Sequence, residues 1–402
     1  MAKKTAVLIG AGKIARGYVG ELFMGEGYHV TFVHHRQEFV DGLRNQGQYM
    51  VYRFNNNGER EDLLMTDFDV ICSKTEQQAY LEALAATPYA AVVTFPGAFD
   101  DIAEDLTKAI RLRYERKVTE PLAVLMCVNT VGPAKYFEEK ILKALNKEEA
   151  DYFHTYVGLV ETLVMRLCTP PAEELLKEDP YSVSTKVNPM LPVDVHGFRP
   201  GHEYPAFFSL EEKVPGKLVK KIWCGNLEHC CLAYYGNYYG HRYVHEAARD
   251  AYVRRCTYYA GQEANAAVAA AYGFTAEEMA FDVPAKWGRN MMDHVPDPLK
   301  RVGADPVRKL GKNDRFIGPA LLSLKMGKLP YFIAKGAACG FYFDLPDDKG
   351  AQRVQAYIKE NGIEKAICHF CTLDVADETE RRLYELILSA YRELSAFDPA
   401  VK

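Results

Sequence analysis

The sequence predicts an α/β fold, in which an N-terminal doubly wound parallel sheet is followed by a mainly α-helical domain. Three observations support this prediction. Short apolar runs of strand length alternate with helical patterns through the first half of the chain, which is typical of consecutive βαβ units. A glycine-rich turn joins the first predicted strand to the first predicted helix. After about residue 170 the alternation stops, and from about residue 211 helical periodicity dominates.

The predicted elements of the first half follow one another in strand–helix order. Strands are expected at residues 5–9, 29–33, 69–72, 91–95 and 122–128, with a further apolar stretch at 156–167. Helices are expected at residues 13–25, 77–86, 101–113 and 134–145. Because crossovers between parallel strands are right-handed, few sheet topologies remain.

The second half is punctuated by proline at residues 169–171 and 188–192, and then becomes helical. The predicted helices are 218–239, 246–272, 309–325, 352–361 and 378–394. A chain of 402 residues has room for two or three domains at about 100–200 residues each. We therefore predict a dinucleotide-type α/β domain over residues 1–205 and a mainly α-helical domain over residues 206–402.

Composition excludes several classes of protein. With 49 Lys and Arg against 54 Asp and Glu, the net charge is −5, so a basic surface for nucleic acid is not expected. No apolar run approaches the roughly 18–20 residues that cross a bilayer, and the N-terminus enters a strand without a cleavable signal. We expect a soluble, cytoplasmic protein. The single C-x-x-C at Cys368–Cys371 lacks a second ligand pair, so no metal site is predicted.

The glycine turn at residues 10–15 predicts a dinucleotide-binding site of the Rossmann type. Its G-x-G-x-x-A pattern lies between a strand and a helix, as this fold requires. Gly10 allows the tight turn, Gly12 lets a pyrophosphate approach the backbone, and Ala15 permits close packing of the helix. The free N–H groups of the helix N-terminus would bind the phosphates. The other candidate cofactor-binding residues of this turn are Ala11, Lys13 and Ile14. The simpler alternative is a tight turn without a ligand.

The end of the second strand lacks the acidic residue that usually binds the adenosine ribose of NAD. His34, His35 and Arg36 stand there instead. Because arginine pairs with phosphate and an aspartate would repel it, these residues favour tolerance of, or preference for, NADP. Alternatively, His34 or His35 hydrogen-bonds the ribose of NAD. The predicted cofactor is therefore NAD or NADP.

Lys221, Asn226 and His229 are predicted to share one face of a helix at the start of the second domain. At roughly 100° per residue, Asn226 falls about 140° and His229 about 80° from Lys221. An amine with a lowered pKa can take a hydroxyl proton, and an amide and an imidazole can stabilise the developing oxyanion. This set suits alcohol–carbonyl interconversion, although the spacing alone is equally that of an ordinary amphipathic helix.

Several motifs together resemble the polyol-specific long-chain dehydrogenases, a family that includes mannitol dehydrogenases, mannitol-1-phosphate 5-dehydrogenases and hexuronate reductases. These motifs are K-x4-N-x2-H at residues 221–229 and G-x-G-x3-R-G at residues 10–17. The segments at 127–129, 166–171 and 240–241 are also similar to family segments. The similarity covers nearly the whole chain. Residues 301–319 resemble the mannitol-1-phosphate 5-dehydrogenase branch in particular.

The resemblance implies a Rossmann-type domain, a mainly α-helical domain and an active site between them, without a metal. It implies that Lys221 is the general acid/base, that Asn226 and His229 hold the reacting oxygen, and that a nicotinamide exchanges hydride with the substrate carbon. It adds Arg16 and Asn129 to the cofactor-binding candidates. Many members are monomers, so we expect a monomer.

A basic segment and one departure from the family concern the substrate. Four candidate phosphate-binding residues lie within residues 301–315: Arg301, Arg308, Lys309 and Arg315. Arginine forks match phosphate oxygens two at a time, although pairing with Asp305 and Asp314 would equally explain these charges. Glu161 stands where the family has Asn or Asp, and it either relays protons beside Lys221 or resizes the pocket.

The predicted function is NAD(P)-dependent interconversion of a polyol phosphate and a ketose phosphate, by default mannitol 1-phosphate and fructose 6-phosphate. The alternatives are a dehydrogenase of an unphosphorylated polyol or sugar acid, and a non-catalytic NAD(P)-sensing protein. For either kind of dehydrogenase, the expected partner is a small-molecule substrate, and neither a nucleic acid nor a membrane is expected.

Overall fold

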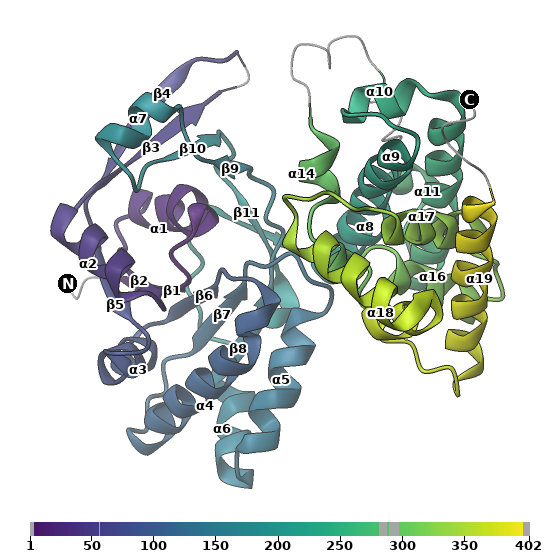
Figure 1. Ribbon diagram of the computed structural model, residues 1–402. Coiled ribbons are helices and arrows are strands. Elements are labelled where there is room, and N and C mark those ends of the chain that lie inside the picture. The colour runs from purple at the N-terminus through teal and green to yellow at the C-terminus, as the bar shows by residue number, and fades with distance from the viewer. Residues whose placement is uncertain (1–3, 56, 281–287, 289–296, 397–402) are drawn as a thin grey trace. The chain divides into compact units, whose positions relative to one another are not determined.

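The computed structural model describes residues 4–55, 57–280, 288 and 297–396. The chain forms two compact units, Met1–Pro215 and Gly216–Lys402 (Figure 1). Among the described residues, no helix combines the length and the apolar character needed to cross a membrane.

Six parallel strands form the main sheet of the first unit, in the order β5-β2-β1-β6-β7-β8. The strands are β1 (Thr5–Ile9), β2 (His29–His34), β5 (Phe68–Cys72), β6 (Tyr89–Val92), β7 (Leu122–Met126) and β8 (Val157–Glu161). In chain order this is the 3-2-1-4-5-6 arrangement of dinucleotide-binding sheets, whose direction of growth reverses between β1 and β6. The predicted doubly wound parallel sheet is confirmed.

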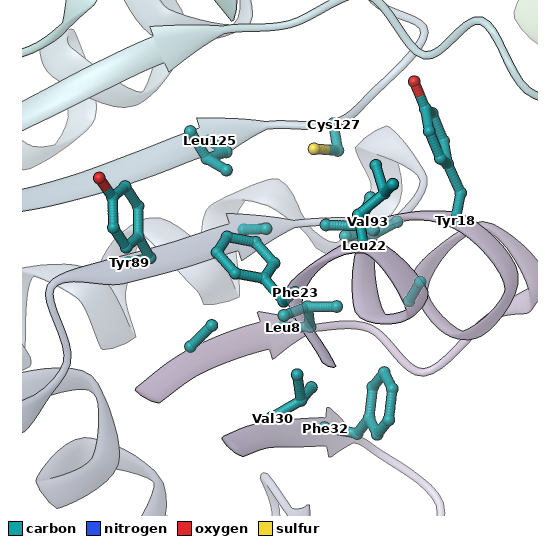
Figure 2. Packing of buried hydrophobic residues seen from close by; sticks show 14 of the residues in the cluster. Leu8, Tyr18, Leu22, Phe23, Val30, Phe32, Tyr89, Val93, Leu125 and Cys127 are labelled. Carbon is teal, nitrogen blue, oxygen red and sulfur yellow. The ribbon is translucent and has the colours of Figure 1, made fainter. Parts of the chain in front are cut away.

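Apolar side chains of β1 alternate between two cores. Leu8 packs with Phe23 and Phe32 on one face, as Figure 2 shows, whereas Val7 and Ile9 join a separate core on the other face. The first face is covered by η1 (Ala15–Val19) and α1 (Gly20–Gly25). The other helices of the unit are α2 (Gln37–Gln46), α3 (Gln77–Ala86), η2 (Pro96–Ala98), α4 (Phe99–Glu115), α5 (Pro133–Ala144), α6 (Lys147–Tyr156), α7 (Glu173–Glu178) and η3 (Val195–Gly197). Burial on both faces explains why the strands are apolar throughout.

Two smaller sheets in the first unit were not predicted. One has the order β4-β3-β10-β9, and the other pairs β11 with β12. Their strands are β3 (Tyr49–Phe54), β4 (Arg60–Met65), β9 (Cys168–Thr169), β10 (Val183–Lys186), β11 (Leu191–Asp194) and β12 (Phe208–Glu211). Because β12 pairs with β11, residues 208–211 belong to the first unit. The units therefore divide after Pro215, beyond the boundary predicted after residue 205.

The second unit is helical, as predicted. The division falls within α8 (Val214–Lys220), whose first two residues belong to the first unit. The helices that follow are η4 (Lys221–Gly225), α9 (Asn226–Tyr238), α10 (Val244–Arg249), α11 (Ala251–Tyr272), α12 (Ala276–Met279), α14 (Leu299–Gly303), α15 (Pro306–Lys309), α16 (Ile317–Lys325), α17 (Tyr331–Phe341), α18 (Lys349–Cys371) and α19 (Glu378–Ser395). The helix α9 packs against α11, α14 and α17. The single helix predicted at 309–325 is wrong, because residues 310–316 form a loop between α15 and α16.

Candidate active site

The glycine turn after β1 has the geometry that a dinucleotide needs. Gly10 has φ +112°, and a Cβ added to it would lie 2.3 Å from the backbone oxygen of Val93, so the fold itself requires glycine there. A Cβ added to Gly12 would meet no protein atom within 4 Å. The open space at Gly12 therefore fits the close approach of a pyrophosphate.

Arg16, expected at the cofactor, is instead buried beneath the turn. Its exposed fraction is 6%, and its guanidinium donates hydrogen bonds to the backbone oxygens of Ala11 and Tyr181, the latter at 3.0 Å. The guanidinium also lies 5.4 Å from the centre of the Phe39 ring. Arg16 therefore holds the glycine turn in place from behind. Of the other predicted turn residues, Ala11 is buried, Gly12 and Lys13 are exposed, and Ile14 is half-buried.

The end of β2 presents two stacked histidines and no acidic side chain. The His34 and His35 rings lie 4.7 Å apart, and Nδ1 of His34 accepts a hydrogen bond from the backbone N–H of Arg36 at 3.2 Å. Burial, followed by the nearby charge of His35, lowers the pKa of His34 to about 4. The neutral ring then carries its proton on Nε2, where it can donate to a ribose oxygen or a phosphate. His35 and Arg36 are exposed.

Two further candidate site residues lie at the carboxyl ends of the neighbouring strands β7 and β8. Asn129 is exposed just beyond β7, whereas Glu161 is buried at the last position of β8. Burial raises the pKa of Glu161 to about 7, a hydrogen bond from the backbone of Ala134 opposes the shift, and the charge of Asp194 adds to it. Within the described part of the chain, Oε2 of Glu161 finds no hydrogen-bond partner. Glu161 can therefore exchange a proton near neutral pH.

In the second unit, Lys221 and Asn226 are joined by a π turn. The backbone N–H of Asn226 donates to the carbonyl of Lys221, five residues earlier. The predicted angle of about 140° between these residues therefore does not apply, because it assumed an α-helix and a π turn has more residues per turn. His229, three residues further along α9, adjoins Asn226 on the helix surface. Burial lowers the pKa of Lys221 to about 8.

His229 is tied to an acidic residue that the sequence analysis did not single out. Nε2 of His229 lies 3.3 Å from Oδ2 of Asp297, and Arg301 donates two hydrogen bonds to the same carboxylate at 2.7 and 2.6 Å. Although burial acts to raise it, the pKa of Asp297 falls to about 2 because His229 and Arg301 donate to it. The sequence signal for this ion pair is the spacing of four residues between Asp297 and Arg301.

The other three residues of the predicted phosphate site differ in their surroundings. Lys309 is 4% exposed, and its ammonium donates to the backbone oxygens of Val302 and Ala304, so it supports the end of α14. Arg308 lies 3.5 Å from Asp305 and 3.4 Å from Asp314, and Arg315 donates to Asp314 at 2.8 Å. The pairing with Asp305 and Asp314 considered from sequence is thus present.

Two of these cations lie near the predicted catalytic helix. Burial is the main cause that lowers the pKa of His229, Asp297 opposes the shift, and the positive charges of Arg301 and Arg315 lower that pKa further. The second unit therefore brings Lys221, Asn226 and His229 together on one helix and places positive charge beside His229. Among the described residues, no group of three or more His, Cys, Asp or Glu side chains is arranged to hold a metal ion.

Comparison with known proteins identifies both units. A family model of the mannitol dehydrogenase Rossmann domain matches residues 4–197, and one of the mannitol dehydrogenase C-terminal domain matches residues 218–369. A protein of Thermoanaerobacter pseudethanolicus named mannitol-1-phosphate 5-dehydrogenase is 28% identical over 97% of this chain and 97% of its own. A protein of the same name from Caldanaerobacter subterraneus subsp. tengcongensis is 27% identical over 95% of this chain and 98% of its own.

A solved structure agrees with the fold. Mannitol 2-dehydrogenase of Pseudomonas fluorescens, in a ternary complex with NAD and D-mannitol, has a TM-score of 0.73 at 17% identity, covering 98% of this chain and 92% of that chain. The family resemblance and the fold class inferred from the sequence are confirmed. The chain belongs to the mannitol dehydrogenase family of oxidoreductases.

Proposed function

We propose that this protein is an NAD(P)-dependent dehydrogenase that interconverts a polyol phosphate and a ketose phosphate. The observation that carries the proposal is the set of Lys221, Asn226 and His229 on one helix, with a lysine pKa of about 8. The names of the relatives that match nearly the full chain support a phosphorylated substrate, by default mannitol 1-phosphate and fructose 6-phosphate. We assign cofactor binding to the first unit and proton transfer to the second.

The proposed roles follow from the groups on the helix. A bound nicotinamide would accept hydride from the substrate carbon during oxidation and return it during reduction. The neutral amine of Lys221 takes the hydroxyl proton, so no metal ion is needed for this step. Asn226 donates a hydrogen bond to the developing oxyanion. Because Nε2 of His229 lies 3.3 Å from the ionised Asp297, we assign the ring proton to Nε2, and Nδ1 then accepts and orients a hydroxyl proton.

The test of this function is NAD(P)H oxidation against a panel of ketoses. We expect the highest kcat/KM with a ketose phosphate such as fructose 6-phosphate. If only fructose or hexuronates are reduced, the phosphate assignment is wrong. If no substrate is reduced while NADH or NADPH still binds, the protein is a nucleotide sensor. The same assay with NADH and NADPH tests the prediction that the residues at the end of β2 favour NADP. A strong preference for NADH would contradict it.

Replacing Arg308 with alanine should raise KM for fructose 6-phosphate by about 10-fold or more, because charge-assisted hydrogen bonds contribute roughly 1.5–3 kcal/mol each. Arg308 suits this test because its side chain is partly exposed and its ion pairs with Asp305 and Asp314, at 3.5 and 3.4 Å, are longer than the Arg301–Asp297 pair at 2.6 Å. KM for free fructose should stay unchanged. The matched control is Lys325→Ala, which removes an exposed cation at the end of α16. Equal effects of Arg308→Ala on both sugars would contradict a phosphate site.

A further inference from the structure

Phe95 is the most exposed large hydrophobic side chain in the described part of the chain, with an exposed fraction of 84%. The sequence predicted a buried strand at 91–95, but β6 ends at Val92 and Phe95 lies beyond it. Single exposed apolar residues are common on protein surfaces, so exposure alone carries no conclusion. The position of Phe95 in the fold distinguishes it.

The segment that carries Phe95 runs beside the glycine turn. The backbone N–H of Val93 donates to the oxygen of Ile9 at 2.8 Å, directly before Gly10. A Cβ added to Gly10 would lie 2.3 Å from the oxygen of Val93 and 2.9 Å from Cγ2 of Thr94. Phe95 therefore follows two residues that touch the turn. This is the point between β1 and β6 where the strand order reverses and where sheets of this type bind dinucleotides.

The backbone holds Phe95 in a defined position. Phe95 has φ −88° and ψ 156°, an extended conformation that the following Pro96 favours. Its carbonyl accepts a hydrogen bond from the N–H of Ala98 at 3.1 Å, which closes the short helix η2. Phe99, the first residue of α4, is anchored in the core with 3% exposure. Burying this ring against a ligand would therefore cost little ordering of the loop.

We propose that Phe95 is a cofactor-binding residue whose ring packs against the nucleotide portion of the bound dinucleotide. The inference rests on the dinucleotide binding proposed above and extends it to a residue outside the glycine motif. An aromatic ring here supplies an apolar wall for a ribose or a base and keeps water from the neighbouring pyrophosphate. It explains why a large apolar side chain is kept exposed beside a polar turn.

The test is the dissociation constant of NADH, or of NADPH if that is the preferred cofactor, measured by nucleotide fluorescence. Phe95→Ala should raise this constant by about 10-fold, as expected for losing part of an aromatic contact area. Phe95→Tyr keeps the ring and should bind as the wild type does. The control is Tyr114→Ala, which removes a partly exposed aromatic ring near the other end of α4 and should leave binding unchanged.

The possible outcomes separate this inference from the proposed function. If the wild type binds neither nucleotide, the proposed function fails. If the wild type binds and Phe95→Ala binds equally well, only the role of Phe95 is wrong. Equal weakening by Phe95→Ala and Tyr114→Ala would also overturn it, because the effect would then be general. Thermal unfolding of each variant verifies the fold, which should be preserved because the Phe95 side chain is outside the core.

Discussion

Replacing Lys221 with alanine should lower kcat by about 10²–10⁴-fold, the range expected for loss of a general acid/base. The dissociation constant of NADH should change by less than about twofold, because the glycine turn lies in the first unit and is untouched. The measurement is steady-state turnover combined with nucleotide binding. Wild-type turnover in this variant would show that another group carries the proton.

The pH profile gives an independent test of the same residue. Because the pKa of Lys221 is about 8, the neutral amine needed for oxidation accumulates as pH rises through 8. The oxidation rate of the wild type should therefore rise and level off above that pH, whereas reduction, which needs the protonated form, should decline there. In Lys221→Ala, neither the rise of the oxidation rate nor the decline of the reduction rate near pH 8 should remain. An added primary amine should restore part of the rate.

Lys220→Ala is the matched control for this experiment. Lys220 precedes the π turn, and its ammonium donates to the backbone oxygen of Glu278. The variant removes an amine from the neighbouring position on the same helix, so nearly normal turnover is expected. A comparable loss in Lys220→Ala and Lys221→Ala would mean that the π turn, and not the Lys221 amine, is what the substitutions disturb.

The sheet was predictable from the sequence because its determinants are local. Each strand of the main sheet is a short apolar run, and the glycine turn marks the first crossover. The strands β3 and β10 were not predictable in this way, because Val51 of β3 pairs with Val183 of β10, far along the chain. A partner at that separation leaves no periodic signal in either segment.

The roles of charged residues were less predictable than the elements that carry them. Arg16 and Lys309 looked like ligand-binding cations, yet both are buried and donate to backbone oxygens. Burial of a charged side chain depends on which carbonyls the tertiary fold leaves nearby, and sequence spacing does not show it. In contrast, Lys221, Asn226 and His229 lie on consecutive turns of the helix, as predicted, although a π turn joins the first two; their roles in catalysis stay predictions.

Gly12→Ala should weaken NADH binding by at least about 100-fold while leaving thermal stability unchanged. An added methyl group meets no protein atom within 4 Å, and the backbone there is not in the left-handed region, so the substitution should not disturb the fold. The methyl group would instead occupy the space through which the pyrophosphate reaches the helix N-terminus. Losing two charge-assisted hydrogen bonds of about 1.5 kcal/mol each corresponds to this change in affinity.

Two further glycines make the experiment decisive. Gly25→Ala adds the same methyl group on α1, also with no protein atom within 4 Å, and should affect neither binding nor stability. Gly10→Ala should instead lower thermal stability, because its Cβ would lie 2.3 Å from the Val93 oxygen at a φ of +112°. These results would distinguish the two glycines of the turn, because Gly10 would be required by the fold and Gly12 by the ligand. Undiminished NADH binding in Gly12→Ala would contradict the placement of the pyrophosphate at this turn.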